Sequence, residues 1–388
     1  MPRIYLDHNA SSPLLPTARE AMTRVLAQGV GNASSLHAPG RAARLVIESA
    51  RQDVARLIGA LPEEIVLTSG GTESNNLAVF GAAAAAPAGR PVVTSDIEHP
   101  SVLGAMQELE RRGMEVRRVR PTRDGVVPAS DILQAVDGSA ALVSLMLANN
   151  EVGTLQPVAE VGAELRRRGI LFHCDAAQAA GKVPIDVRGL RVDLLSIAGH
   201  KFGGPQGVGA LYVRRGLELH PHLRGGGQEL NRRPGTENVA AIAGLGAAAA
   251  EAASSIGESA RRQSTLRDFL EDEVSRRLPG ARVNGRAVTR IPNTSSLAIR
   301  GVTGESLVVA LDLEGIAISA GSACSAGTIR RSHVLEAMGL REESGESIRV
   351  SFGPGTMRDE LVTFLEALER VVARARAAPA EVGARRGA

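Results

Sequence analysis

The stretch SIAGHKFGGPQGVGALYV (residues 196–213) decides the fold. It joins two short apolar runs, typical of buried strands, through a glycine-rich turn. Lys201 stands at the carboxyl end of the first run, where the ligands of open α/β sheets bind. Lys201 is therefore either a functional amine or an ordinary surface lysine beside a turn, and this stretch alone favours neither.

Similar apolar runs alternate with Ala-, Leu- and Arg-rich helical stretches from about residue 45 to 250. Continuous apolar runs are typical of strands buried on both faces of a mostly parallel sheet. The runs of this region are 65–69, 91–95, 115–119, 141–147, 170–176, 194–199 and 209–213.

After residue 290 the pattern changes, because the runs TSSLAI, IAISA and SIRVSF are interspersed with helices. Residues 240–278 are expected to form a long connecting helix, and residues 358–378 a helix with one apolar face. We therefore expect an α/β protein with two domains. The expected division is a large domain over 15–250, a small α+β domain over 1–14 and 251–378, and a disordered tail over 379–388.

The composition excludes several classes of protein. The 388 residues are 44% hydrophobic, enough for a sizeable core, and the net charge of only +3 predicts no direct binding of nucleic acid. No run reaches the ~18 apolar residues that span a bilayer, and Met1 leads directly into the strand-like IYLD. We expect a soluble cytoplasmic protein that does not bind a membrane, and we predict no metal site.

Lysine and cysteine are both rare in this chain. Two lysines, Lys182 and Lys201, stand against 43 arginines, and an ε-amine can form an imine and lose its proton whereas a guanidinium cannot. The two cysteines, Cys174 and Cys324, make no disulfide framework, which fits a reducing compartment. Cys174, in ILFHCDA, is expected to be a small buried hydrophobe. Cys324, among Ser, Ala and Gly in GSACSAG, is expected to be a nucleophile on a polar loop.

The segment TSGGTESNN (68–76) predicts a strand, a Gly-Gly-Thr turn and a helix. The backbone N–H groups and the helix dipole would then face an anion, most naturally a phosphate. Gly71 permits close approach and Thr72 adds a hydroxyl donor. The segment is neither a Walker A nor a GxGxxG sequence, which argues against a nucleotide. Alternatively, it is a capped helix after a tight turn.

Three further residues are candidates for a site. Asp175 ends a buried strand and needs a cationic partner, which a protonated pyridine nitrogen would supply, unless it only caps the next helix. His99, at the end of another strand, is either structural or an imidazole that stacks on a planar cofactor and shuttles protons. Arg349, on a predicted strand, could form a bidentate pair with a substrate carboxylate.

Together these segments resemble the cysteine desulfurase family, fold-type-I enzymes dependent on pyridoxal 5'-phosphate (PLP) within the class-V aminotransferases. The resemblance is to the group for iron–sulfur cluster assembly, with an extended Cys loop, and covers nearly the whole chain in the family's order. The blocks that carry it are YLDHNASSP (5–13), GNASSLH (31–37), TSGGTESNN, IEH (97–99), NNEVGTLQP (149–157), DAAQAAGK (175–182), AGHKFGGPQGVGALYV (198–213), GGGQE (225–229), RRPGTEN (232–238), GSACSAG (321–327) and IRVSFG (348–353).

The resemblance implies PLP as the cofactor and assigns roles to most of these residues. Lys201 would carry PLP as a Schiff base and move protons, and Cys324, Lys201 and His99 would be catalytic. Asn150 and Arg349 would hold the substrate carboxylate. The cofactor would be bound by Lys201, by His99 on its ring, by Asp175 at the pyridine nitrogen, by Gln178 at the phenolic oxygen, by Gly71, Thr72 and His200 at the phosphate, and by Thr236 from the other subunit of a homodimer.

The implied reaction converts L-cysteine to L-alanine and leaves a persulfide on Cys324. An acceptor protein would then take the sulfur for iron–sulfur clusters or for thiolated tRNA and cofactors. Alternatives are selenocysteine lysis, another PLP reaction of a small amino acid, and a non-catalytic scaffold. Two positions depart from the family: Ala198 stands where Ser is common, which removes a phosphate hydrogen bond of about 1 kcal/mol, and Gln206 where Lys is frequent.

Overall fold

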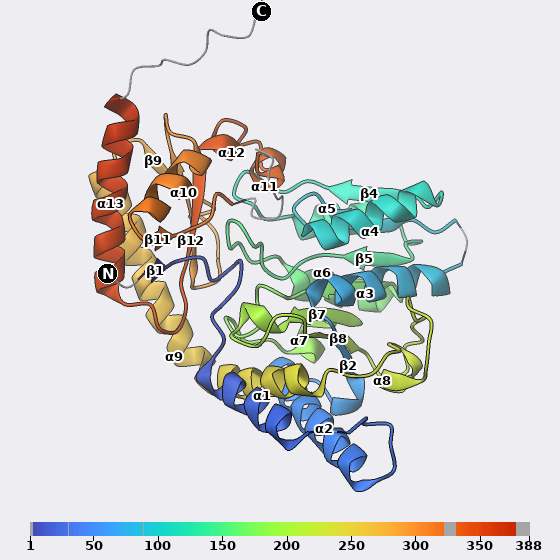
Figure 1. The fold of residues 1–388 in the computed structure, drawn as a ribbon. Helices are drawn as coiled ribbons and strands as arrows, with labels where there is room; N and C mark the ends of the chain where they lie inside the picture. The colour runs from blue at the N-terminus through green and yellow to red at the C-terminus, as the bar shows by residue number, and fades with distance from the viewer. Residues whose placement is uncertain (1–2, 30, 88, 322–330, 378–388) are drawn as a thin grey trace, which may run out of the picture.

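A seven-stranded sheet forms the centre of the larger part of the molecule (Figure 1). The computed structural model describes residues 3–29, 31–87, 89–321 and 331–377. The strands of this sheet are β2 (Ile65–Thr68), β3 (Val92–Ser95), β4 (Val116–Val119), β5 (Leu142–Ser144), β6 (Leu171–Asp175), β7 (Leu194–Ala198) and β8 (Gly209–Val213).

The strand order is β2-β8-β7-β6-β5-β3-β4. The strands from β7 to β4 are parallel, and β8 runs antiparallel to both of its neighbours, β7 and β2. The predicted mostly parallel α/β sheet is confirmed. Because β2 then runs in the same direction as β3, β6 and β7, the loops that follow these four strands leave from one edge of the sheet.

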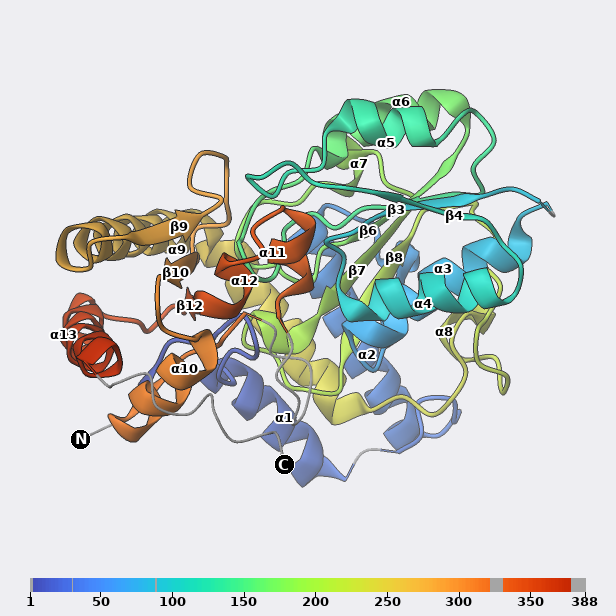
Figure 2. The ribbon, with the colours of Figure 1, turned by 90° about the horizontal axis from the view of Figure 1, so that it is seen from above.

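Helices cover both faces of the sheet, and successive strand residues face opposite layers. Val66 and Leu194 pack with α3 (Gly71–Ala85) and α4 (Pro100–Arg111). Their neighbours Leu67 and Leu195 pack into the other core. That core also takes in α2 (Ala38–Ile58), α5 (Ala129–Ala135), α6 (Val158–Arg168) and α7 (Val187–Leu190). Figure 2 shows α5 and α6 across the sheet from α3 and α4. Burial on both faces explains why the strand sequences are continuously apolar.

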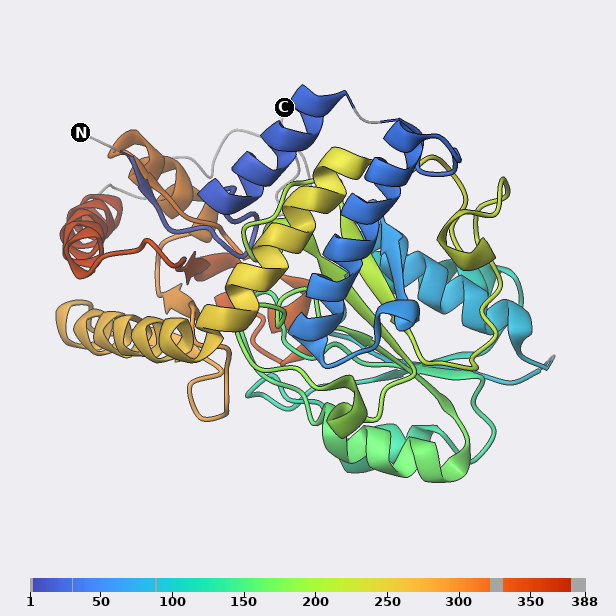
Figure 3. The ribbon, with the colours of Figure 1, turned by 90° about the horizontal axis from the view of Figure 1, so that it is seen from below.

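The long helix α9 (Val239–Arg277) connects the two parts of the molecule, as its apolar and then charged sequence predicts. Figure 3 shows its first half beside α1 (Pro16–Gln28) and α2. Within the described ranges, α9 is the one helix long and apolar enough to cross a membrane, and 44% of its most apolar window is buried. The buried residues, among them Ile242 and Leu245, belong to the large core, as in a core helix.

A second core lies beside the C-terminal half of α9 and includes Leu6, Leu270 and Phe364. Its antiparallel sheet has the order β12 (Ser347–Ser351), β10 (Thr294–Ile299), β9 (Ala281–Asn284), and β1 (Ile4–Tyr5) pairs in parallel with β11 (Ile316–Ala317).

The remaining helices of the described residues are η1 (Pro62–Glu64), η2 (Gly199–Lys201), α8 (Gln228–Asn231), α10 (Gly304–Leu313), α11 (His333–Ala337), α12 (Glu343–Glu346) and α13 (Arg358–Ala377).

Two predicted runs are longer than the strands they contain. IAISA forms only the two-residue strand β11, because its partner β1 is equally short. Of the run ALVSLML, only the three residues of β5 form a strand. The N–H groups of Leu145 and Leu147 still donate to carbonyls of β6. The predicted tail over 379–388 lies outside the described residues, as does Cys324.

Candidate active site

The loop between β2 and α3 forms a cup that suits a phosphate. Gly70 has φ 148°, a backbone region that favours glycine, and α3 begins at Gly71 and runs for 15 residues. The first turn of a helix leaves backbone N–H groups without intrahelical partners. A cavity of about 350 Å³ lies in front of this turn, with Thr72 and His200 on its wall. The cup has the size and the donors for a phosphate monoester.

Ala198 lies directly behind this cup. A Cβ on Gly71 would come within 3.3 Å of the Ala198 Cβ, so small residues at both positions let the loop approach β7. Ser196, one strand repeat earlier, is fully buried, and its Oγ lies 3.0 Å from His173 Nε2. Ser196 therefore does not replace the hydroxyl that Ala198 lacks.

Asp175 and His99 are linked by a chain of hydrogen bonds. Asn75 Nδ2 donates to Asp175 Oδ2 at 2.7 Å and to Ser101 Oγ at 2.8 Å. Ser101 Oγ in turn lies 2.7 Å from His99 Nδ1. The other carboxylate oxygen of Asp175 accepts from the N–H of Ala177, a capping bond to a turn rather than to a helix. The network holds a buried carboxylate and an imidazole over the same edge of the sheet.

His99 is both a structural and a candidate functional residue. Its Nδ1 accepts from Ser101 N at 3.1 Å and caps α4, which places the proton of the neutral ring on Nε2. Burial lowers the pKa of His99 below 6.5, Lys201 and His333 lower it further, and Asp175 opposes them. The imidazole is therefore neutral near pH 7.

Lys201 lies at the end of β7 in the short helix η2, and its amine reaches the N-terminal segment. Nζ donates to Asn9 O at 2.6 Å and to Ala10 O at 3.1 Å. Gln178 Nε2 donates to the same Asn9 carbonyl at 2.8 Å. His200, beside Lys201, lies with Nδ1 3.4 Å from Ser11 Oγ, and burial together with Lys201, Lys182 and His99 lowers its pKa to about 4.

Arg349, in the middle of β12, contacts Asn150. Arg349 Nη1 donates to Asn150 O at 2.9 Å, and Nη2 donates to Asp7 Oδ1 at 2.8 Å. Arg349 Nε and Asn150 Oδ1 are buried and have no hydrogen-bond partner in the described part of the chain. Because Nε has no partner in the described part of the chain, the guanidinium keeps a donor for a substrate carboxylate beside its ion pair with Asp7.

Thr236, the candidate for the phosphate that was expected from another subunit, does not line the cavity at the start of α3. It is exposed, on a segment that Arg233 attaches to α3 through a 2.8 Å ion pair with Glu73.

The segment that contains Cys324 lies outside the described residues, but its flanks are placed. A Cβ on Gly321, before the segment, would lie 3.2 Å from Glu151 Oε2. Ser332, after the segment, donates its hydroxyl to the same oxygen, and His333 Nε2 lies 3.1 Å from Glu98 O. The chain therefore leaves and returns beside Asn150 and His99, the neighbours of Glu151 and Glu98.

Four residues of this network were not predicted from the sequence. Asn9, Asn75, Ser101 and Glu98 lie within or beside the quoted blocks, but side chains of their types are common in caps and turns. No spacing rule marks which amide bridges two candidate residues from different strands.

The chain matches known proteins over most of its length. Residues 4–364 match the family described as Aminotransferase class-V. The cysteine desulfurase IscS of Dictyoglomus turgidum is 43% identical over 375 residues, 96% of this chain and 95% of that protein. A solved NifS-like protein superimposes with a TM-score of 0.90 at 35% identity, covering 96% of this chain and 100% of that one. SspA in complex with cysteine gives a TM-score of 0.79 at 33% identity, covering 91% and 100%. The chain therefore belongs to the class-V aminotransferase family, in the branch whose members are named cysteine desulfurases.

Proposed function

We propose that this protein is a PLP-dependent cysteine desulfurase that converts L-cysteine to L-alanine and leaves the sulfur on Cys324. One observation carries the proposal. The amine of Lys201 and the buried carboxylate of Asp175 follow the adjacent strands β7 and β6, and the glycine loop at the start of α3 follows β2 at the same edge of the sheet. An amine, a carboxylate and a phosphate cup are the groups that PLP requires.

When bound, PLP supplies an electron sink for the charge that develops at the substrate Cα. Gly71, Thr72 and His200 would hold its phosphate, Asp175 its pyridine nitrogen and Gln178 its phenolic oxygen. Thr236 of a second subunit would reach the same phosphate, which makes a homodimer part of the proposal. The buried Asn75, which donates to Asp175, would keep that carboxylate oriented toward the ring.

The protein's own groups would move the protons. Lys201 Nζ, held at the N-terminal segment by two carbonyls, would take the proton that leaves the Cα of cysteine. The neutral imidazole of His99 would cover the ring face and relay protons through Nε2. Asn150 and Arg349 would hold the substrate carboxylate, and Asp7 would neutralise Arg349 between turnovers.

The sulfur step needs no external oxidant or reductant. The thiolate of Cys324 attacks the substrate sulfur, the C–S bond breaks, and its electron pair remains with the carbon that becomes the methyl group of alanine. Cysteine and a thiol thus give alanine and a persulfide. The remaining proposals are transfer of that sulfur to an acceptor protein, a cytoplasmic location, and the division into domains over 15–250 and over 1–14 with 251–378.

Variants of Lys201 and of both cysteines test this function. K201A should lose the visible absorption of bound PLP and the release of alanine. C324S should keep the absorption but form no persulfide and release no sulfide with a reductant. C174S is the matched control, because Cys174 is fully buried on β6. It should keep the absorption of bound PLP and should still form the persulfide and release sulfide with a reductant. Sulfide release by C324S at the rate of the parent would contradict the proposal.

A further inference from the structure

The only two lysines of this chain converge on one residue, Asn9. Lys201 Nζ donates to the carbonyl of Asn9 at 2.6 Å. Lys182 Nζ donates to the side-chain oxygen Asn9 Oδ1 at 3.0 Å. In a chain that uses arginine at 43 other basic positions, this convergence indicates that both amines serve one site.

Lys182 also closes a ring of hydrogen bonds with Gln178. Its Nζ donates to Gln178 Oε1 at 2.7 Å, while Gln178 Nε2 donates to Asn9 O at 2.8 Å. The two ends of the Gln178 amide are not equivalent, because Nε2 donates hydrogen bonds and Oε1 accepts them. The Lys182 bond therefore fixes which end of Gln178 faces Asn9 and Lys201.

Asn9 in turn is held by polar side chains on and beside β10 and β12. Asn9 Nδ2 donates to Thr294 Oγ1 at 2.8 Å, and Asn9 N donates to Ser351 Oγ at 2.9 Å. Asn293 Nδ2 donates to the Oδ1 that Lys182 also uses, at 3.2 Å. The ring of Lys182, Gln178 and Asn9 therefore connects the Lys201 amine to β10 and β12.

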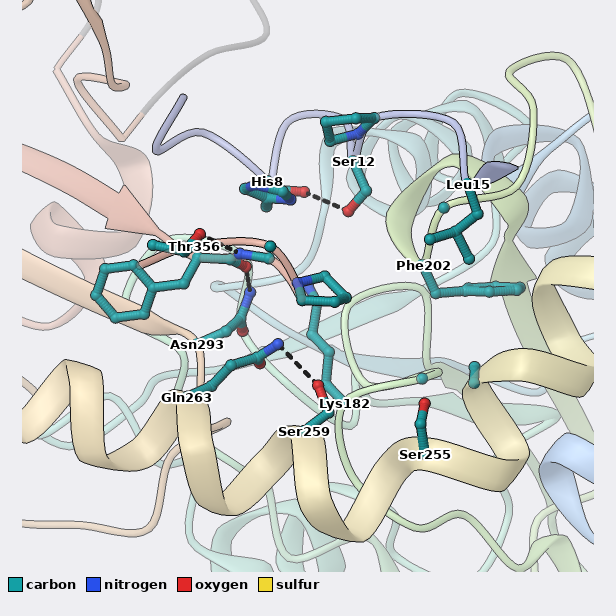
Figure 4. Close-up of a pocket in the computed structure, with 18 of the residues that line it drawn as sticks. His8, Ser12, Leu15, Lys182, Phe202, Ser255, Ser259, Gln263, Asn293 and Thr356 are labelled. Atoms are coloured by element: carbon teal, nitrogen blue, oxygen red, sulfur yellow. Dashed lines mark hydrogen bonds between the residues drawn. The ribbon is translucent and has the colours of Figure 1, made fainter. Parts of the chain in front are cut away.

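An arginine at position 182 would bring more N–H donors than Asn9 and Gln178 can accept. Lys182 is buried on the wall of a cavity of about 510 Å³ between the N-terminal segment and α9 (Figure 4). Its described acceptors are the two neutral amide oxygens of Asn9 and Gln178. A guanidinium brings five N–H donors in a rigid fork, and each buried donor without an acceptor costs free energy. A lysine has three donors and can also be neutral.

We propose that Lys182 is a positioning residue of the active site, which through Asn9 and Gln178 holds the Lys201 amine and the donor end of the Gln178 amide in place for the cofactor. The inference deepens the proposed function and rests on it for the role of Lys201. It adds a second lysine that touches neither substrate nor cofactor.

The electrostatics of the site agree with this arrangement. Burial lowers the pKa of Lys182 well below 10.5, and Lys201 and Arg349 lower it further. His8 of the N-terminal segment and His200 beside Lys201 also face Lys182, and each has its pKa lowered in part by that charge. Two amines that share one acceptor residue should therefore titrate as a coupled pair.

The experiment uses the scarcity of lysine. Full-length protein labelled with ¹³C only in lysine gives two ε-methylene signals, one per residue, and each is followed against pH before PLP is added. In K201A the remaining Lys182 signal should titrate about one pH unit higher than in the parent, because the Lys201 charge that lowers the pKa of Lys182 is gone. In K182M the Lys201 signal should follow a single titration step, because the amine coupled to it is gone, so the test does not depend on one variant.

A second readout separates positioning from charge. K182M frees Gln178, so the affinity for added PLP, measured by visible absorption, should fall about tenfold. K182R should not restore it. S255A is the matched control: Ser255 lines the same cavity but donates to Glu251 O within α9, and both readouts should stay at parental values.

Unchanged titration of Lys201 in K182M and of Lys182 in K201A would overturn the inference, and so would recovery of PLP affinity in K182R. Loss of desulfurase activity is not used as a readout. If the proposed function itself is wrong, the parent protein will release no alanine from cysteine. That result is independent of how the two lysine signals titrate.

Discussion

Glu98 lies beside His99 with its carboxyl group completely buried, and replacing it by glutamine should stabilise the protein in a pH-dependent way. Oε1 accepts from Ser95 Oγ at 2.7 Å and from Met146 N at 2.9 Å, while Oε2 is buried without a partner among the described residues. Burial raises the pKa of Glu98 from 4.5 to about 8, opposed by those two hydrogen bonds, while Asp175 raises it further. The folded protein therefore keeps this proton at pH 7.

The sign follows from linkage. Between pH 4.5 and 8 the folded state holds a proton that the unfolded state has released, so Glu98 lowers stability as pH rises through that window. One pH unit is worth about 1.4 kcal/mol, which gives a penalty of roughly 3 kcal/mol at pH 7. E98Q removes the ionisable group and should therefore recover most of this penalty. About 1 kcal/mol is lost again, because the glutamine amide brings an additional buried N–H.

The assay is urea unfolding of parent and E98Q at several pH values from 5 to 9. The difference in unfolding free energy should grow by about 1.4 kcal/mol per pH unit up to pH 8 and then level off. His8 and His173, whose pKa values burial lowers to about 4, make both proteins less stable as pH falls from 6.5, but they cancel in the difference. E258Q, at an exposed position of α9, is the control. A pH-independent difference for E98Q would refute the reasoning.

Two further substitutions test packing and the site network. A Cβ on Gly353 would overlap the His8 ring, so G353A should lower the unfolding free energy by about 1–3 kcal/mol, whereas G355A, where a Cβ meets nothing within 4 Å, should stay within about 0.5 kcal/mol of the parent in the same urea assay. N75A removes the donor to Asp175 Oδ2 and to Ser101 Oγ, so PLP affinity in an absorption titration should fall about tenfold; unchanged affinity would show that Asn75 does not orient Asp175.

The sheet was predictable because its physical signals are local. Strands buried on both faces must be apolar throughout, and the glycine loop before α3 requires the φ of 148° that Gly70 adopts. The predicted edge follows from strand direction, which brings Lys201 and Asp175 to neighbouring strand ends.

The linking residues were not predictable, because their partners are distant in the chain. Asn9 contacts Lys201 and Lys182 across 192 and 173 positions, and no local sequence pattern relates segments so far apart. The hydrogen bond between Arg349 and Asp7, across 342 positions, is another contact between distant segments. Periodicity and spacing describe single elements, whereas these bonds depend on how the two cores meet.

The fate of the sulfur after one turnover tests the central claim most directly. Full-length protein loaded with PLP is given L-cysteine with radiolabelled sulfur, alkylated without reductant and digested, and the labelled peptide is identified. We predict label on the peptide that contains Cys324, in amounts equal to the alanine released, in both the parent and C174S. Alanine release with the label on Cys174, or with no label on Cys324, would contradict the account.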